Sequence, residues 1–94
     1  MQGFAEQKVP GGKLVAVQVE WGRNIKKVKI TGDFFLHPEE ALPVMEKALA
    51  GTRLGASKDE IAGKITKLLA MSNAELIGVT PEAIAEAIKT AMKK

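Results

Sequence analysis

Apolar and polar residues alternate along residues 14–21, which is the pattern of a half-buried β-strand. The apolar side of this strand would carry Val15, Val17, Val19 and Trp21. After a Gly22-Arg23-Asn24 turn the alternation resumes over residues 25–31, with Val28 and Ile30 on the apolar side. Because the connection is so short, the two strands are predicted to pair as an antiparallel hairpin.

The chain ahead of this hairpin has two interpretations. Residues 4–9 can add an edge strand, because Pro10-Gly11-Gly12 is a turn signal and Pro10 has no amide hydrogen to give to a ladder. Alternatively, residues 1–7 are a flexible segment in front of the folded part.

Beyond the strands, the spacing of apolar residues changes to that of a helix. The first helix is predicted to begin near Glu39 or Glu40, since Pro38 and Pro43 are tolerated only close to a helix start. Both glutamates would then lie at the positive end of the helix dipole, and Gly51 would cap the far end. The inward stripe of this helix is predicted to contain Ala41, Leu42, Met45, Ala48 and Leu49.

Two further helices have recognisable start signals. The second opens with a capping box over residues 57–60, in which Ser57 and Glu60 satisfy each other's free amides. The third has Thr80 as N-cap and Pro81 in its first position. Their predicted inward residues are Ile61, Ile65, Leu68 and Leu69 in the second, and Ile84, Ala87, Ile88 and Ala91 in the third.

Strands followed by helices predict an α+β fold, with a three-stranded antiparallel sheet and about three helices packed on one face. The 94 residues fit a single domain over residues 1–94, and 46% hydrophobic but only 4% aromatic residues indicate an aliphatic core. No apolar run approaches the roughly 18 residues of a membrane span, and the N-terminus lacks the apolar run of a signal peptide. We therefore expect a cytoplasmic protein without membrane contact.

Composition also limits the chemistry. The absence of cysteine excludes disulfides, thiolate metal sites and a cysteine nucleophile. His37 is the sole histidine and has no partners for a metal site or a nucleophile, so capping or packing is favoured over catalysis. Asp33 has no second carboxylate nearby in the sequence for acid–base work. We predict no catalytic residue and no metal ligand.

The net charge of +3 is modest, and acids and bases are interspersed. Apart from the C-terminal lysines, the basic residues cluster only at Lys26, Lys27 and Lys29, where no aromatic side chain is interleaved for base stacking. Nucleic-acid binding through these lysines is an alternative that the sequence does not favour.

Two segments carry the remaining signals. The Pro10-Gly11-Gly12-Lys13 turn lets a ligand approach the backbone and could place Lys13 beside a phosphate, although a plain hairpin turn also explains it. Residues 32–38 place two adjacent phenylalanines, Phe34 and Phe35, on an extended segment, where their side chains point to opposite sides. One can enter the core while the other stays available to a partner.

Taken together, residues 8–15 (KVPGGKLV) and 32–40 (GDFFLHPEE) resemble the signature of the C-terminal domain of lipoate-protein ligase. The similarity extends to the last helix and includes its start at residues 78–82 (GVTPE). The resemblance implies a fold like that of iron-sulfur scaffold and sulfur-acceptor proteins. Their cysteines are missing here, so their chemistry does not carry over.

In most bacterial members of the family this domain is fused to a larger catalytic domain, whereas some archaea encode it separately. A chain whose Met1 lies a few residues before the first motif resembles the separate form. The resemblance then implies an accessory subunit that is no enzyme by itself and binds no cofactor alone. With a large catalytic subunit it would form a heterodimer that uses ATP, Mg²⁺ and lipoate to make lipoyl-AMP, ahead of the lipoylation of lysines in lipoyl-domain proteins.

Adenylation needs positioning, charge stabilisation and exclusion of water, which a small domain closing over a pocket could supply. The candidates for contact with ATP or the adenylate are Lys13, Lys8, Gly11 and Gly12. The candidates for docking onto the large subunit are Asp33, Phe34, Phe35 and His37. The main alternative is a free-standing module that binds a small ligand and has no enzymatic role.

Overall fold

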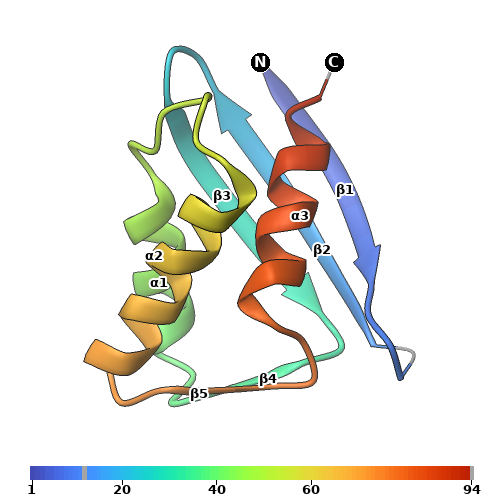
Figure 1. Cartoon of the computed structure of the whole chain (residues 1–94), viewed down its shortest axis with the longest axis vertical. Coiled ribbons are helices and arrows are strands. Elements are labelled where there is room, and N and C mark those ends of the chain that lie inside the picture. Colours follow the sequence, from blue (N-terminus) through green and yellow to red (C-terminus); the bar gives the residue numbers. More distant parts are fainter. Residues whose placement is uncertain (12, 94) are drawn as a thin grey trace.

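The chain folds around a three-stranded antiparallel sheet with the strand order β1-β2-β3 (Figure 1). The structure is a computed structural model that describes residues 1–11 and 13–93. The sheet strands are β1 (Gln2–Lys8), β2 (Leu14–Trp21) and β3 (Ile25–Gly32). The helices are α1 (Ala41–Leu49), α2 (Lys58–Met71) and α3 (Pro81–Ala91). The predicted α+β architecture is confirmed; the likeness to the iron-sulfur scaffold fold stays a prediction.

The alternation of the central hairpin determines which side of the sheet is buried. Val15, Val17 and Val19 have no exposed surface, and Trp21 is 4% exposed. Of the two interpretations of the N-terminus, the structure shows the edge strand, which begins earlier than predicted and runs antiparallel to β2 from Gln2. The strand is tied down further by the terminal amino group of Met1, which donates a hydrogen bond to the Trp21 carbonyl over 2.8 Å.

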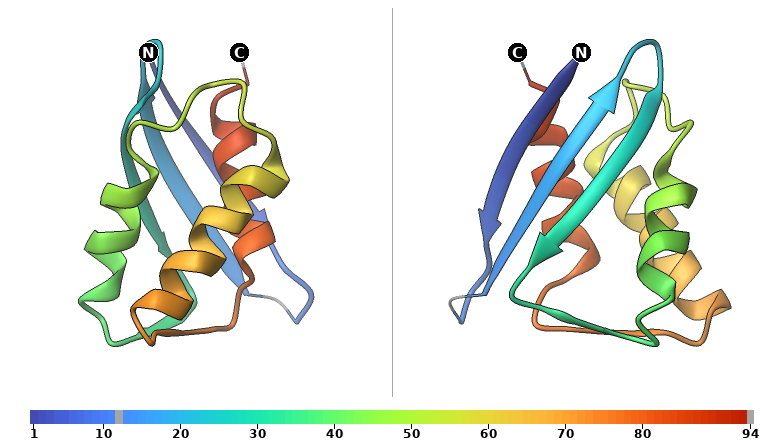
Figure 2. Two further views of the ribbon diagram at one scale, coloured as in Figure 1. Left: turned by 60° about the vertical axis from the view of Figure 1, so that its left-hand side comes forward. Right: turned by 180° about the vertical axis from the view of Figure 1, so that it is seen from behind.

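All three helices lie on the same side of the sheet, and the opposite face is open (Figure 2). α3 packs on β1 and β2, α1 packs beside β3, and α2 packs against both of the other helices. The buried apolar residues form one cluster between sheet and helices. In the described part of the chain, no helix combines the length and apolarity needed to cross a membrane.

The caps at the starts of α2 and α3 follow the sequence signals with one exception. The Ser57 hydroxyl accepts a hydrogen bond from the Glu60 amide at 3.1 Å, and the Thr80 hydroxyl accepts one from the Ala83 amide at 3.1 Å. The predicted return bond of the capping box is replaced: the Glu60 carboxylate accepts a hydrogen bond from Arg53 at 2.9 Å. The cap therefore links α2 to the preceding loop.

The first helix differs from its prediction at its start and on one face. It begins at Ala41, so that Glu39 and Glu40 precede the first turn instead of lying in it. A separate turn forms there, in which the Ala41 amide donates to the Pro38 carbonyl at 3.0 Å. Ala48, predicted to face inward, is exposed. The helix ends at Leu49 with Ala50 as its C-cap, so Gly51 is not the cap: it has a φ of 89°, and its amide donates to the Ile25 carbonyl at 2.7 Å.

A second, two-stranded sheet was not predicted. β4 (Phe35–His37) pairs antiparallel with β5 (Glu75–Ile77), although the two segments are far apart in the sequence. This β4–β5 ribbon crosses the bottom of the molecule in Figure 1. We refer to residues 9–11, 13, 32–40 and 72–80 as the lower end, and to residues 22–24 and 50–57 as the upper end, where both termini also lie.

Candidate functional site

The two segments that carry the sequence signals meet at the lower end and enclose an open hollow. Its volume is about 420 Å³. We call it the glycine–phenylalanine hollow; it is lined by Gly11, Lys13, Gly32, Asp33, Phe34 and Phe35. The glycine turn and the diphenylalanine segment, which the sequence separates by about twenty residues, therefore share one surface.

Backbone hydrogen bonds bring the two segments together. The Val9 amide donates to the Lys13 carbonyl at 2.9 Å and closes the turn between β1 and β2. The Asp33 amide donates to the Leu14 carbonyl at 2.8 Å, which holds the end of β3 against the start of β2. Lys13 and Asp33 are consequently both held next to Leu14. The hollow is therefore lined by one positively charged side chain, Lys13, and one negatively charged side chain, Asp33.

Gly32 permits this close approach. Its φ is 148°, and a Cβ atom at this position would lie 2.2 Å from the Leu14 carbonyl oxygen. Any side chain would therefore push β3 away from β2 at the edge of the hollow. Gly78 is needed for its φ of 101°, not for space, since its Cβ would lie at an ordinary contact distance of 3.4 Å from the Asp33 carbonyl oxygen.

The two phenylalanines divide as the sequence predicts. Phe34 is half-buried and packs against the core, whereas Phe35 is 62% exposed. The His37 ring lies parallel to the Phe35 ring, with an interplanar angle of 4° and centroids 6.3 Å apart. His37 is not a helix cap, because α1 begins after Glu40 and has no side-chain cap. It extends the aromatic surface of Phe35.

The charged side chains that line the hollow, Lys13 and Asp33, point into solvent-exposed space. Within residues 1–11 and 13–93, neither Lys13 nor Asp33 makes a side-chain hydrogen bond or an ion pair. Both are exposed. Their charges are therefore available to a ligand or to a partner surface.

Not every predicted site residue reaches the hollow. Lys8 is exposed and pairs with Leu14 at the end of β1, but it does not line the hollow. Gly12 lies outside the described residues. His37 lines a neighbouring hollow of about 320 Å³, which shares Gly32, Phe34 and Phe35 with the first. The predicted docking residues thus surround two adjoining hollows.

Sequence reasoning missed the contribution of β5. In the register of the ribbon Ile77 lies opposite Phe35, and Glu75 lies opposite His37. The segment has only three strand residues, too few for an alternating pattern to stand out. The position of the apolar Ile77 just ahead of Gly78 and the Thr80 cap was the signal available in the sequence.

The open face of the sheet is a separate feature. The register across the three strands places exposed Phe4, Gln18 and Lys29 in one row, so an aromatic side chain does share a face with the basic cluster. The sequence had shown none interleaved. Among the described residues, no group of three or more histidine, aspartate and glutamate side chains could hold a metal ion.

No protein-family model and no curated protein matches this chain. A solved structure does match, which defines the class of protein that the chain resembles: components of a lipoylation system. It comes from a study of an archaeal lipoylation system, a bi-partite lipoate protein ligase and its E2 lipoyl domain from Thermoplasma acidophilum. The alignment covers 94% of each chain with 27% sequence identity and a TM-score of 0.75.

Proposed function

We propose that this chain is the accessory subunit of a bipartite lipoate protein ligase. It would act with a large catalytic subunit in the ATP-dependent activation of lipoate to lipoyl-AMP, before lipoyl groups are attached to acceptor lysines. The observation that carries the proposal is the likeness to a chain from a lipoate protein ligase system, which extends over 94% of both chains. The two chains are therefore of nearly equal length.

The shape of the glycine–phenylalanine hollow supports a role in completing a partner's site. Small-molecule sites usually bury about 70–90% of their ligand. This hollow is open, and six of the described residues line it, so these residues do not enclose a nucleotide or a lipoate molecule alone. A second protein surface placed over it would close it and exclude water.

The lining residues suit the reaction that the proposal assigns. Activation joins the lipoate carboxylate to the α-phosphorus of ATP and releases pyrophosphate, so negative charge gathers around the reacting phosphates. In our proposal Lys13 lies beside those phosphates and stabilises the charge. Gly11, which has a φ of 99° and no heavy atom near its Cβ position, leaves its backbone open to a close approach.

Reconstitution tests the proposal. The purified chain is mixed with the large ligase subunit from the same organism, and lipoate-dependent AMP and lipoyl-AMP formation are measured with and without it. Activation should require the chain, while transfer from preformed lipoyl-AMP to an acceptor domain should proceed without it. Equal activation in both mixtures would reject the proposal. The intact mass of the chain shows in the same reactions whether it is itself lipoylated, which would also contradict an accessory role.

A free-standing binding module is the principal alternative, and it would bind lipoate or a nucleotide in the absence of the large subunit. Isothermal titration of the isolated chain with each ligand decides this. Nucleic-acid binding is the further alternative, favoured only by Phe4 on the same open face as Lys29. It predicts a mobility shift that weakens steeply with salt and is lost in Lys29→Ala.

A further inference from the structure

The β4–β5 ribbon exposes two large apolar side chains directly opposite each other. Phe35 is 62% exposed and Ile77 is 44% exposed, and the two residues pair in the ribbon register. Opposite residues of antiparallel strands have Cβ atoms about 4.5–5.5 Å apart, so these side chains form one patch. The parallel ring of His37 extends it along β4.

This patch is continuous with the glycine–phenylalanine hollow, because Phe35 belongs to both. A stable protein interface buries about 800 Å² on each partner, which is far more than the lining of this hollow. Any partner that closes the hollow must therefore also cover the neighbouring surface. The ribbon lies immediately beside the hollow, with Ile77 one cross-strand step from Phe35.

We propose that the β4–β5 ribbon is the anchor by which this chain docks onto the large subunit of the ligase, with Ile77 and Phe35 as its energetic centre. This inference rests on the proposed function, since it takes the large subunit as the occupant. Side chains at the middle of an interface are removed completely from water, and a few such residues usually carry most of the binding energy. The large subunit must offer an apolar recess to receive them.

The polar residues of the ribbon would lie at the rim. His37 and Glu75 are opposite each other and both are exposed. Rim charges contribute mainly to orientation and to the association rate, and little to affinity. In this proposal the cross-strand pair Phe35 and Ile77 supplies the affinity, and the pair His37 and Glu75, two positions along the ribbon, aligns the partner.

The same chain offers a matched control. Phe4 is also 62% exposed, but it lies on β1, on the open face of the sheet. Loss of the Phe4 ring removes the same kind of surface without touching the ribbon. The comparison between Phe35→Ser and Phe4→Ser therefore separates a docking role from a general effect of exposed apolar surface.

The test measures the affinity of the purified chain for the large subunit by isothermal titration, and lipoyl-AMP formation in the same mixtures. Ile77→Ser and Phe35→Ser should each weaken binding by roughly tenfold or more, while Phe4→Ser binds like the wild type. Circular dichroism melts show that each variant is folded; if Ile77→Ser does not fold, Phe35→Ser decides.

The outcomes separate the docking inference from the proposed function. Unchanged affinity of the ribbon variants, in mixtures where the wild-type chain binds and supports activation, overturns the docking inference alone. Binding that depends on the ribbon without any effect on activation contradicts the proposed function instead. If sedimentation shows that the variants lose only self-association, then a second copy of the chain is the occupant and the inference is wrong.

Discussion

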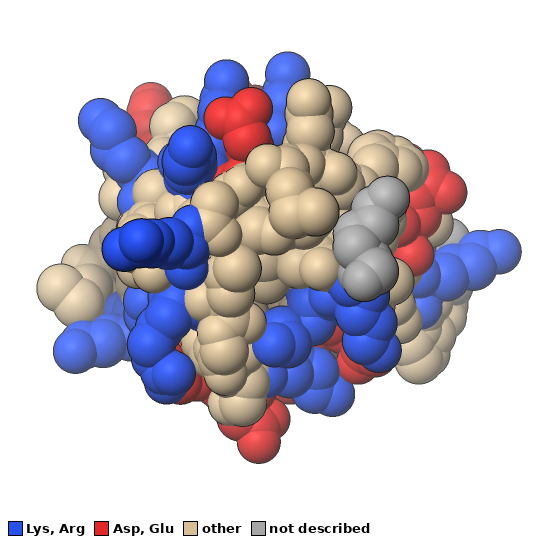
Figure 3. Space-filling model, turned by 90° about the horizontal axis from the view of Figure 1, so that it is seen from above, with Lys and Arg blue, Asp and Glu red and all other residues tan. Residues whose placement is uncertain are grey.

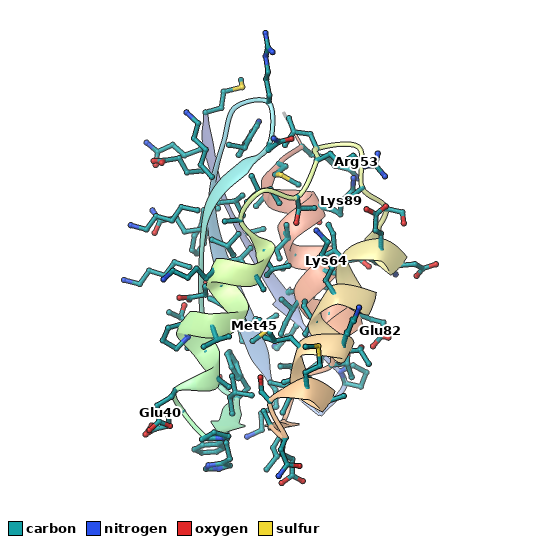
Figure 4. The ribbon with its side chains drawn as sticks, turned by 90° about the vertical axis from the view of Figure 1, so that its left-hand side faces the viewer. Glu40, Met45, Arg53, Lys64, Glu82 and Lys89 are labelled. Carbon is teal, nitrogen blue, oxygen red and sulfur yellow. The ribbon has the colours of Figure 1, made fainter. Side chains whose placement is uncertain are left out.

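The two ends of the molecule are built in different ways. At the upper end, side chains reinforce the backbone bonds that hold the loop between α1 and α2, such as the bond from the Ile25 amide to the Thr52 carbonyl at 2.9 Å. Lys64 donates to the hydroxyl of buried Thr52 at 3.0 Å, and Lys89 donates to the Ala56 carbonyl at 2.8 Å. Figure 4 shows Lys64, Lys89 and Arg53 on α2, α3 and this loop. These charged groups are engaged in holding the fold together.

At the lower end, close backbone contacts hold the segments together. Gly32 lets β3 approach β2, and Gly78 adopts the positive φ that the segment after β5 requires. The polar side chains that line the hollow there, Lys13 and Asp33, make no hydrogen bond within the described residues. Because glycines and backbone bonds stabilise this end, its side chains remain free for a partner.

The contrast also shows why charge density is a poor guide to function here. Lysine and arginine side chains spread over the upper end, as Figure 3 shows from above. Two lysines of the neighbouring helices, Lys64 and Lys89, have hydrogen-bond partners in the loop at this end. The lower end has few basic groups, yet Lys13 is both exposed and unpaired within the described residues.

The largest effect is expected at Gly32, on which the backbone fit of the lower end depends. Gly32→Ala should lower the free energy of unfolding by about 2–3 kcal/mol, because its Cβ meets the Leu14 carbonyl oxygen. Urea denaturation measures the change. Gly63→Ala on α2, where a Cβ meets nothing within 4 Å, is the control and should stabilise by about 0.5–1 kcal/mol. Equal stability of Gly32→Ala and wild type would show that the backbone fit is unimportant.

A second prediction concerns the free lysine of the hollow. Lys13→Ala should slow lipoate adenylation in the reconstituted pair by roughly tenfold or more, because a charge beside the phosphates is lost. Its unfolding free energy should stay within about 0.5 kcal/mol of the wild type, since the side chain is exposed. Lys29→Ala, an exposed lysine on the open sheet face, serves as control. Adenylation at the wild-type rate would show that Lys13 has no role in the reaction.

A substitution at the upper end should lower stability and leave activity unchanged, the opposite of Lys13→Ala. Thr52→Val keeps the shape of the buried residue but removes the hydrogen-bond acceptor for Lys64. The free energy of unfolding should therefore fall by about 1 kcal/mol. The rate of adenylation at saturating chain should not change. A loss of activity in a folded Thr52→Val protein would contradict the division between the two ends.

The smallest effect is expected for the ion pair between Arg53 and Glu60. Their side chains are 67% and 39% exposed, and exposed pairs contribute little because solvent screens them. Arg53→Ala should therefore change stability by less than about 0.5 kcal/mol in thermal melts at physiological salt. A change of several kcal/mol would mean that this pair organises the loop.

Much of the fold could be predicted from the sequence, because strong local signals specify it. The alternation of valines fixes the buried face of β2, and Ser57 and Thr80 mark helix starts through local hydrogen bonds. The prediction was wrong where another hydrogen-bonding group competed with the local signal. The turn at Pro38 keeps Glu40 out of α1, and Arg53 takes the carboxylate that the capping box had assigned to Ser57.

The site was predictable only in part. Its glycine turn and diphenylalanine segment were recognisable as separate motifs, and the hairpin geometry explains why they meet. The pairing of Phe35 with Ile77 could not be foreseen, because it joins three-residue strands that the sequence places far apart. Non-local pairing of this kind depends on how α2 returns the chain to the lower end.

The most direct test compares three versions of the chain in a single lipoyl-AMP assay with the large subunit: wild type, the lower-end double variant Lys13→Ala/Ile77→Ser, and the upper-end variant Thr52→Val. If the lower end completes the partner's site, the double variant fails to support activation and the upper-end variant matches the wild type. Should the double variant support activation as well as the wild type, the lower end has no part in the reaction.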